Sequence, residues 1–175
     1  PLDTHGQGFI EGNAWNYGLY VPHAIDSLIA WHGGNAAFIA HLDSLFTMRL
    51  DDVYFAHTED ISRDGIIGNY VHGNEPGHHI AYLYNYAGAP EKTQARVRMI
   101  CESMYGPDVN GLCGNDDAGQ MSAWFLFSSL GFYPVAPGSG WYDLGAPLVR
   151  SAVIKVGDQN LQIETEGARD GALVE

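Results

Sequence analysis

The spacing of apolar and polar positions changes once along the chain, from a helical period to an alternating one. Up to about residue 133, apolar residues recur every three or four positions, which is the period of an amphipathic helix. This part predicts helices over residues 23–31, 35–48, 76–87, 91–105 and 118–130. After about residue 141 apolar and polar residues alternate, so this part predicts β structure.

Several boundaries follow from the same pattern. Gly33-Gly34 ends the first helix, and Asn35 is placed to cap the second. The polar, glycine-containing stretch 49–73 predicts a long loop, and loops of that length in compact domains are often functional. The helix at 118–130 is apolar on nearly every side, so we expect it to be buried.

The alternating part predicts a hairpin. Residues 152–156 and 161–164 flank Gly157-Asp158, a pair of residues typical of tight turns. Because a two-stranded hairpin is marginal by itself, we expect the tail from 141 to 175 to begin a larger β region. The chain also starts at Pro1 without a methionine, so we expect it to be a piece of a longer protein.

Composition narrows the classes of function. With 175 residues and 46% hydrophobic content the chain can form a packed core, which excludes a disordered protein. A net charge of −13 disfavours nucleic acid as a partner and favours neutral, hydroxylated or cationic ligands. No apolar run reaches the roughly 18 residues of a membrane span. Cys101 and Cys113 are too few for a disulfide scaffold, and two unpaired thiols are favoured over one bridge.

Three predicted helix entrances combine glycine, asparagine and acidic residues: E-G-N-A-W (11–15), G-N-E-P (73–76) and G-N-D-D (114–117). Each one alone is explained by helix capping, since Asn and Asp side chains accept hydrogen bonds from unpaired N–H groups. Together, beside aromatic residues, they also suit a sugar site, where carboxylates and amides bind hydroxyls and aromatic rings stack on the pyranose. Two opposed carboxylates can then cleave a glycosidic bond, one as acid and one as base, and a separation of roughly 6.5–9.5 Å predicts inversion.

Metal binding is the second possibility that these motifs raise. Asn74 and Glu75 offer hard oxygen ligands, which are typical of Ca²⁺ rather than zinc. His78 and His79 are adjacent and cannot simply share one ion, and no H-E-x-x-H motif is present, so zinc is disfavoured. For this histidine pair we expect one packed and one loop-facing side chain, and a role in sugar binding is equally open.

Three long phrases, at 11–23, 73–98 and 111–135, resemble the C-terminal catalytic part of glycoside hydrolase family 92, and the resemblance covers about residues 8–165. It implies a Ca²⁺-dependent exo-α-mannosidase that inverts the anomeric centre and acts on mannose-containing glycans. Its members are secreted or periplasmic, so the resemblance implies that location here.

The same resemblance implies a mainly α fold. Residues 1–138 would form part of an (α/α)6 toroid, the catalytic domain, and residues 139–175 would begin a C-terminal β region, a sandwich or hairpin. The N-terminal β-sandwich of the family would lie outside this chain, and the rest of the parent polypeptide would be its partner.

The resemblance also assigns roles to residues. Glu11 would be the general acid and Asp117 the general base, with Asp116 beside it. Asn115 stands where some members carry another aspartate. Members specific for α-1,2 linkages carry a His-Glu pair before N-E-P; residues 69–72 read N-Y-V-H here, so the linkage preference stays open.

The remaining roles concern binding. The residues expected to contact the sugar are Asn13, Trp15, His78, His79 and Asn115, and those expected to hold calcium are Asn74, Glu75 and the carbonyl of Gly73. Two other hypotheses remain: a catalytically inactive carbohydrate-binding fragment, and a metallohydrolase that uses the histidines. Hydrolysis against mere binding of a mannoside separates the first from the enzyme, and the identity of the bound metal separates the second.

Overall fold

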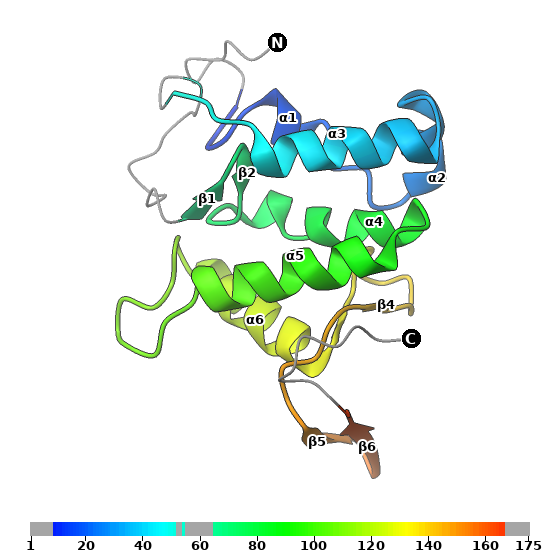
Figure 1. Ribbon diagram of the computed structural model, residues 1–175. Coiled ribbons are helices and arrows are strands. Elements are labelled where there is room, and N and C mark those ends of the chain that lie inside the picture. The colour runs from blue at the N-terminus through cyan, green and yellow to red at the C-terminus, as the bar shows by residue number, and fades with distance from the viewer. Residues whose placement is uncertain (1–8, 52–53, 55–64, 167–175) are drawn as a thin grey trace.

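The computed structural model describes residues 9–51, 54 and 65–166, and its regular structure is mainly helical (Figure 1). The longest helices lie roughly in layers, with α3 above α4 and α5, and α6 below them. The α-helices are α1 (Ala14–Tyr17), α2 (Ile25–Trp31), α3 (Asn35–Thr47), α4 (Leu83–Tyr86), α5 (Pro90–Ser103) and α6 (Gln120–Leu130). Short 3-10 turns are η3 (Glu75–Gly77), η4 (Ile80–Tyr82) and η5 (Asp117–Gly119).

The strands described form antiparallel pairs. They are β1 (Ile66–Ile67) with β2 (Tyr70–Val71), β3 (Phe132–Tyr133) with β4 (Asp143–Leu144), and β5 (Ser151–Val156) with β6 (Gln159–Glu164). The β5–β6 hairpin turns at Gly157-Asp158, as predicted, and projects from the helical part of the molecule (Figure 1).

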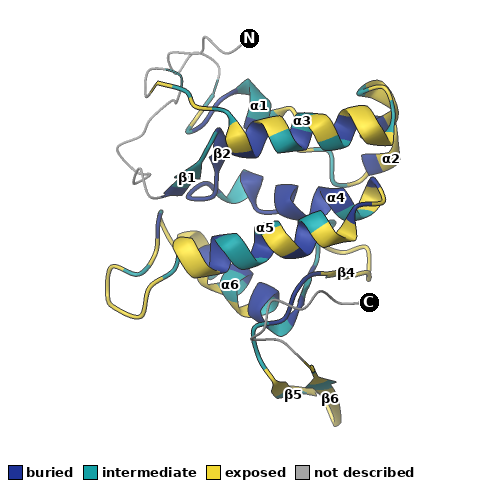
Figure 2. Ribbon diagram, viewed as in Figure 1, coloured by how far each residue is buried: buried dark blue, intermediate teal, exposed yellow. Residues whose placement is uncertain are grey.

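The core lies between the helices. The segment of η4 and α4 is buried from Ile80 to Tyr84 and runs between α3 and α5 (Figure 2). Phe38 and Leu42 of α3 are fully buried in the same cluster, as is Trp124 of α6. This is the apolar face that the three- and four-residue spacing predicts.

The predictions for α2, α3, α5, α6 and the hairpin are confirmed, and the mainly α fold with them. The toroid over 1–138 and the β region over 139–175 stay predictions. Cys101 and Cys113 are both buried and are not bridged to each other, as expected. Within the described residues no helix has the length and apolar content that a membrane crossing requires.

Three expectations about the helices are wrong in detail. Asn35 is the first residue of α3 rather than its cap, which is Gly34 at φ 98°, a conformation that glycine adopts without strain. The expected helix over 76–87 is broken into η3, η4 and α4, and Pro76 and Gly77, both poor formers of helix interiors, sit in its first turn. The helix α6 is not buried all round, because Leu126 is 60% exposed.

The expected loop over 49–73 contains structure. Most of 52–64 lies outside the described residues, but β1 and β2 form a hairpin, and Asn69, Tyr70, Val71 and His72 are buried. The polar character of this stretch reflects buried hydrogen bonding rather than exposure. His72, for example, lies 2.7 Å from the hydroxyls of both Tyr70 and Tyr105.

Candidate active site

The second and third glycine-asparagine motifs meet through their glycines. A Cβ atom on Gly114 would lie 2.4 Å from the carbonyl oxygen of Gly73, so only glycine allows this approach. The loop before η5 is thereby held against the loop before η3. This contact between glycines 41 positions apart in sequence brings Glu75 and Asp117 to one region.

The first motif is joined to the same region through β2. Asn13 caps α1 by accepting a hydrogen bond from the Trp15 amide (3.0 Å), and its Nδ2 donates to Asn69 Oδ1 (2.7 Å). Asn16 accepts from the amide of Val71 at 3.1 Å. Asn13 is fully buried, and its amide holds these loops together.

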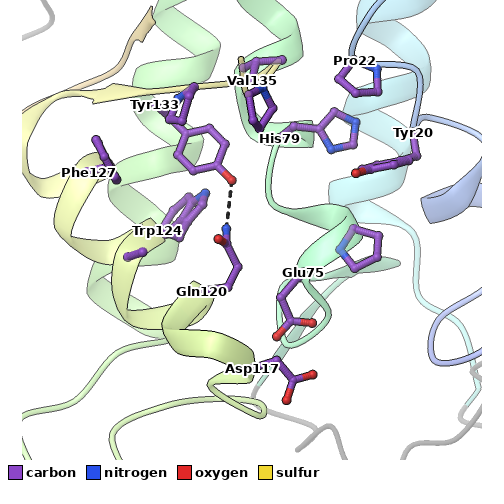
Figure 3. Close-up of a pocket in the computed structure, with 14 residues that line it drawn as sticks. Tyr20, Pro22, Glu75, His79, Asp117, Gln120, Trp124, Phe127, Tyr133 and Val135 are labelled. Carbon is purple, nitrogen blue, oxygen red and sulfur yellow. Dashed lines mark hydrogen bonds between the residues drawn. The ribbon is translucent and has the colours of Figure 1, made fainter. Parts of the chain in front are cut away.

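A pocket of about 600 Å³ opens where α6, η3 and the segment after α1 come together (Figure 3). Glu75 and Asp117 lie next to each other at one edge of it. Its remaining walls are mainly aromatic side chains and prolines, with one amide: Tyr20, Pro22, Pro76, His79, Gln120, Ala123, Trp124, Phe127, Tyr133, Pro134, Val135 and Pro137. Carboxylates beside ring faces are the chemistry expected for a sugar.

The Glu75 carboxyl at this edge of the pocket has a raised pKa. Burial raises the pKa of its carboxyl, and the negative charges of Asp117 and Asp116 raise it further. Its Oε1 is buried and has no hydrogen-bond partner among the described residues. A buried carboxylate oxygen near other acids is a position that a cation stabilises.

The residues at this edge offer oxygen donors of the type that binds Ca²⁺. Glu75 Oε1 is a hard oxygen donor without a hydrogen-bond partner among the described residues. The side-chain Nδ2 of Asn74 donates to the Tyr17 hydroxyl at 3.1 Å, which leaves the side-chain oxygen of Asn74 for other contacts. No group of three His, Cys, Asp or Glu side chains suited to a metal occurs in the described part of the chain. An oxygen set completed by amides and carbonyls suits Ca²⁺ better than zinc.

The turn into α6 positions Asp117. Asp116 accepts hydrogen bonds from the amide (2.9 Å) and hydroxyl (2.8 Å) of Ser122, and these bonds lower the pKa of its carboxyl. Ala118 and Gly119 then take positive φ values of 53° and 80°. Asp116 thus fixes the start of α6, while Asp117 lies at the pocket and is exposed.

Both histidines of the H-H pair are buried, so the expectation of one loop-facing side chain is wrong. His79 lines the pocket and donates from Nε2 to the carbonyl of Leu19 (2.8 Å). His78 lies behind the wall, where burial lowers its pKa to about 4 and keeps it neutral.

Other residues expected at the site are not among those that line this pocket. Glu11, half-buried at a φ of 59°, is not among the residues that line this pocket. Trp15 stacks on His41 with ring centroids 4.4 Å apart and borders a separate pocket of about 190 Å³. Asn115 is exposed and does not line the 600 Å³ pocket.

The motifs alone missed much of the pocket wall. Gln120, Trp124 and Phe127 stand at i, i+4 and i+7 on α6, so their shared face could have been found from the helical period. Tyr20 lies in an irregular segment and Tyr133 in the short strand β3, and neither carries a sequence signal of this kind.

Comparison with known proteins identifies the family. The model of the glycosyl hydrolase family 92 catalytic domain matches residues 1–174. The chain belongs to this family. An α-mannosidase of family GH92 from Bacteroides thetaiotaomicron, solved in complex with mannoimidazole, is 43% identical with a TM-score of 0.79, over 86% of this chain and 20% of that one. A family GH92 inverting mannosidase from the same species is 33% identical with a TM-score of 0.71, over 88% of this chain and 22% of that one.

A curated relative gives a similar result at lower identity. An uncharacterized secreted glycosidase of Arthroderma benhamiae is 30% identical over 154 residues, which is 88% of this chain and 17% of that protein. The family 92 chain described here therefore spans about a fifth of the length of the relatives that it matches.

Proposed function

We propose that this chain forms part of the active site of a secreted exo-α-mannosidase that releases terminal α-linked mannose from glycans with inversion. The observation that carries the proposal is the pocket in which Glu75 and Asp117 lie together beside aromatic walls, in a chain of family 92. Two relatives over 30% identical are mannosidases by name, and one of them is named as inverting.

Asp117 is the proposed general base. It is exposed at the pocket edge, where it can take a proton from a water molecule attacking the anomeric carbon. Asp116 supports it from the neighbouring position, because its own oxygens are held by Ser122 and fix the turn.

Glu11 is the proposed general acid. In that role it protonates the leaving oxygen from the side of the sugar opposite to Asp117, so the two carboxyls face each other across the substrate. The first motif is tied to β2 by Asn13 and Asn16, which supports a place for Glu11 near the same region.

Calcium is the proposed cofactor, held by Asn74, Glu75 and the carbonyl of Gly73. When bound, the ion supplies a hard, positively charged contact for sugar hydroxyls. Glu75 in turn binds it as a carboxylate, since the cation reverses the effect of the neighbouring acids on its pKa. His79 and the exposed ring of Tyr20 complete the wall on which the sugar ring rests.

The proposal is tested by hydrolysis of 4-nitrophenyl α-mannoside, using this chain and the longer polypeptide that carries it. Asp117→Asn and Glu11→Gln should each lower kcat by about 100-fold or more, because general acid–base groups contribute roughly that much. Proton NMR of the first product should show β-mannose. Chelation should lower activity, and added Ca²⁺ should restore it.

Four outcomes would contradict parts of this proposal. Full activity in Asp117→Asn would show that Asp117 is not the general base. Full activity after chelation would show that the reaction does not need a bound ion. Binding of mannose without hydrolysis by the longer polypeptide would favour a carbohydrate-binding fragment. Zinc in place of calcium would favour a histidine-dependent metallohydrolase.

A further inference from the structure

Gln120 is the one amide side chain in the pocket wall, and it is held from two sides. Its Nε2 lies 3.1 Å from Nδ1 of His78. The same nitrogen lies 3.1 Å from the hydroxyl of Tyr133 (Figure 3). Gln120 is the first residue of α6, so the backbone that carries it is the fixed start of a helix. Both partners are buried residues of the core.

The chemistry of His78 decides which way the amide points. The Nε2 of His78 lies 3.0 Å from the backbone carbonyl of His72, which can only accept, so Nε2 carries the proton. Because His78 is neutral, its Nδ1 is an acceptor and requires a donor. The group of Gln120 that faces it is therefore the NH₂, and the alternative amide orientation is excluded.

The backbone of His78 is also fixed. The indole Nε1 of Trp124 donates to the His78 carbonyl at 2.9 Å, and the Trp124 ring is fully buried. With both N–H groups of Gln120 engaged, the polar atom that it can offer to a ligand is its carbonyl Oε1. That atom can only accept a hydrogen bond.

We propose that Gln120 is a specificity-determining residue whose Oε1 accepts a hydrogen bond from one hydroxyl of the bound sugar, and that His78 and Tyr133 are positioning residues for it. The inference rests on the proposed function, because it takes the pocket to be the sugar site. Phe127 on the same helix face offers a ring and no acceptor. A sugar that lacks the hydroxyl in question would lose its partner on this wall.

The test compares substrates as well as variants. Initial rates are measured on the longer polypeptide that carries this chain, for 4-nitrophenyl α-mannoside and its 2-, 3-, 4- and 6-deoxy analogues. The wild type should disfavour one analogue by about ten-fold in kcat/KM, as expected for one lost hydrogen bond. Gln120→Met, similar in volume, should lower kcat/KM for the mannoside by about ten-fold and leave that analogue unchanged.

Two further variants separate recognition from structure. Tyr133→Phe removes one anchor of the amide and should weaken discrimination of the same analogue by a smaller factor. Leu126→Met, on the exposed side of α6, is the matched control and should change none of the five rates. Melting temperatures show that each variant is folded, and Gln120→Asn replaces Gln120→Met if that variant does not fold.

Two results would overturn the inference. One is an equal loss for all five substrates in the Gln120 variant, which indicates a structural role. The other is an unchanged preference among the analogues. If the wild type hydrolyses none of the five, the proposed function itself fails; if it hydrolyses them without Gln120-dependent selectivity, only this inference fails.

Discussion

The helical part of the molecule and its β5–β6 hairpin differ in what holds them. In the helical part, Trp124, Tyr82 and Phe38 are fully buried in one core. In the hairpin all six residue pairs are in register, yet Val153 is 66% exposed and Leu161 48%. Backbone pairing can therefore be complete in a region that contributes little burial, and burial supplies most of the stability.

The space beside the hairpin explains this difference. A groove of about 1040 Å³ separates β5 and β6 from α6 and β4, and apolar side chains line both sides of it, among them Leu126, Leu144, Ile154 and Leu161. The cross-strand pair Ile154 and Leu161 shares one face of the hairpin. The alternating pattern thus determines which side chains share the apolar face of the hairpin, but it does not require that other residues bury this face.

The largest expected effect is at the centre of the helical part. Trp124→Ala should lower the free energy of unfolding by about 3–5 kcal/mol, because it leaves a cavity and removes the bond to the His78 carbonyl. Urea denaturation measures this change. Trp141→Ala, at a tryptophan that is 81% exposed, is the control and should stay within about 0.5 kcal/mol. Equal losses in the two variants would mean that the regions do not differ as described.

The second largest expected effect is a loss of stability of the helical part at acid pH. The pKa of His78 is about 4 when folded and 6.5 otherwise, so the unfolded chain takes up its proton first as the pH falls. Stability is full above pH 6.5 and should decline by about 3 kcal/mol toward pH 4. Burial also lowers the pKa of His72, which adds in the same direction.

Urea unfolding at pH 7 and pH 4.5 measures this decline. His78→Gln removes one buried titrating group and should flatten the pH dependence. A wild-type stability that is constant between the two pH values would show that these histidines are not buried neutral.

A smaller effect is expected where two loops meet. Gly114→Ala places a Cβ against the Gly73 carbonyl and should cost about 1–3 kcal/mol, since the backbone has to move apart. The matched variant is Gly106→Ala, whose nearest contact would be 3.4 Å. A crystal structure or melting temperature for Gly114→Ala that matches the wild type would show that this contact does not set the distance between the loops.

The smallest effect is expected in the hairpin. Leu161→Thr keeps a strand-forming residue at a 48% exposed position and should change the free energy of unfolding by about 0.5 kcal/mol or less. It should also reduce the fluorescence of a hydrophobic dye bound to the groove. A loss of 2 kcal/mol or more would show that the groove is covered in solution.

The sequence predicted the helices well because their apolar spacing is repeated over several turns. The helix α5 begins at Pro90, as expected from its fixed φ, and the hairpin turns at its Gly-Asp pair. The stretch 65–72 was assigned to a loop because Gly65 and Gly68 interrupt its short apolar runs. Hydrogen bonds from the distant residues Asn13 and Asn16 help to hold it in the folded structure. The local sequence pattern does not show which distant residues will contact this stretch.

The site was predicted in part for the same reason. Glu75 and Asp117 meet at the pocket, and each stands in a glycine-rich motif that can be seen locally. Tyr20 and Tyr133 join them from outside the three glycine-asparagine motifs, and no local spacing marks either residue as part of a pocket wall. The distance between Glu11 and Asp117 is also a property of the whole fold, and their facing arrangement stays a prediction.

The two buried thiols can report how often the helical part of the molecule opens. Burial raises the pKa of Cys101 to about 12, so at neutral pH its sulfur is protonated as well as enclosed, and alkylating reagents react with thiolates. Cys113 is enclosed in the same core. The rate at which a reagent such as iodoacetamide modifies these sulfurs would therefore report how often this half of the molecule opens, without any engineered label.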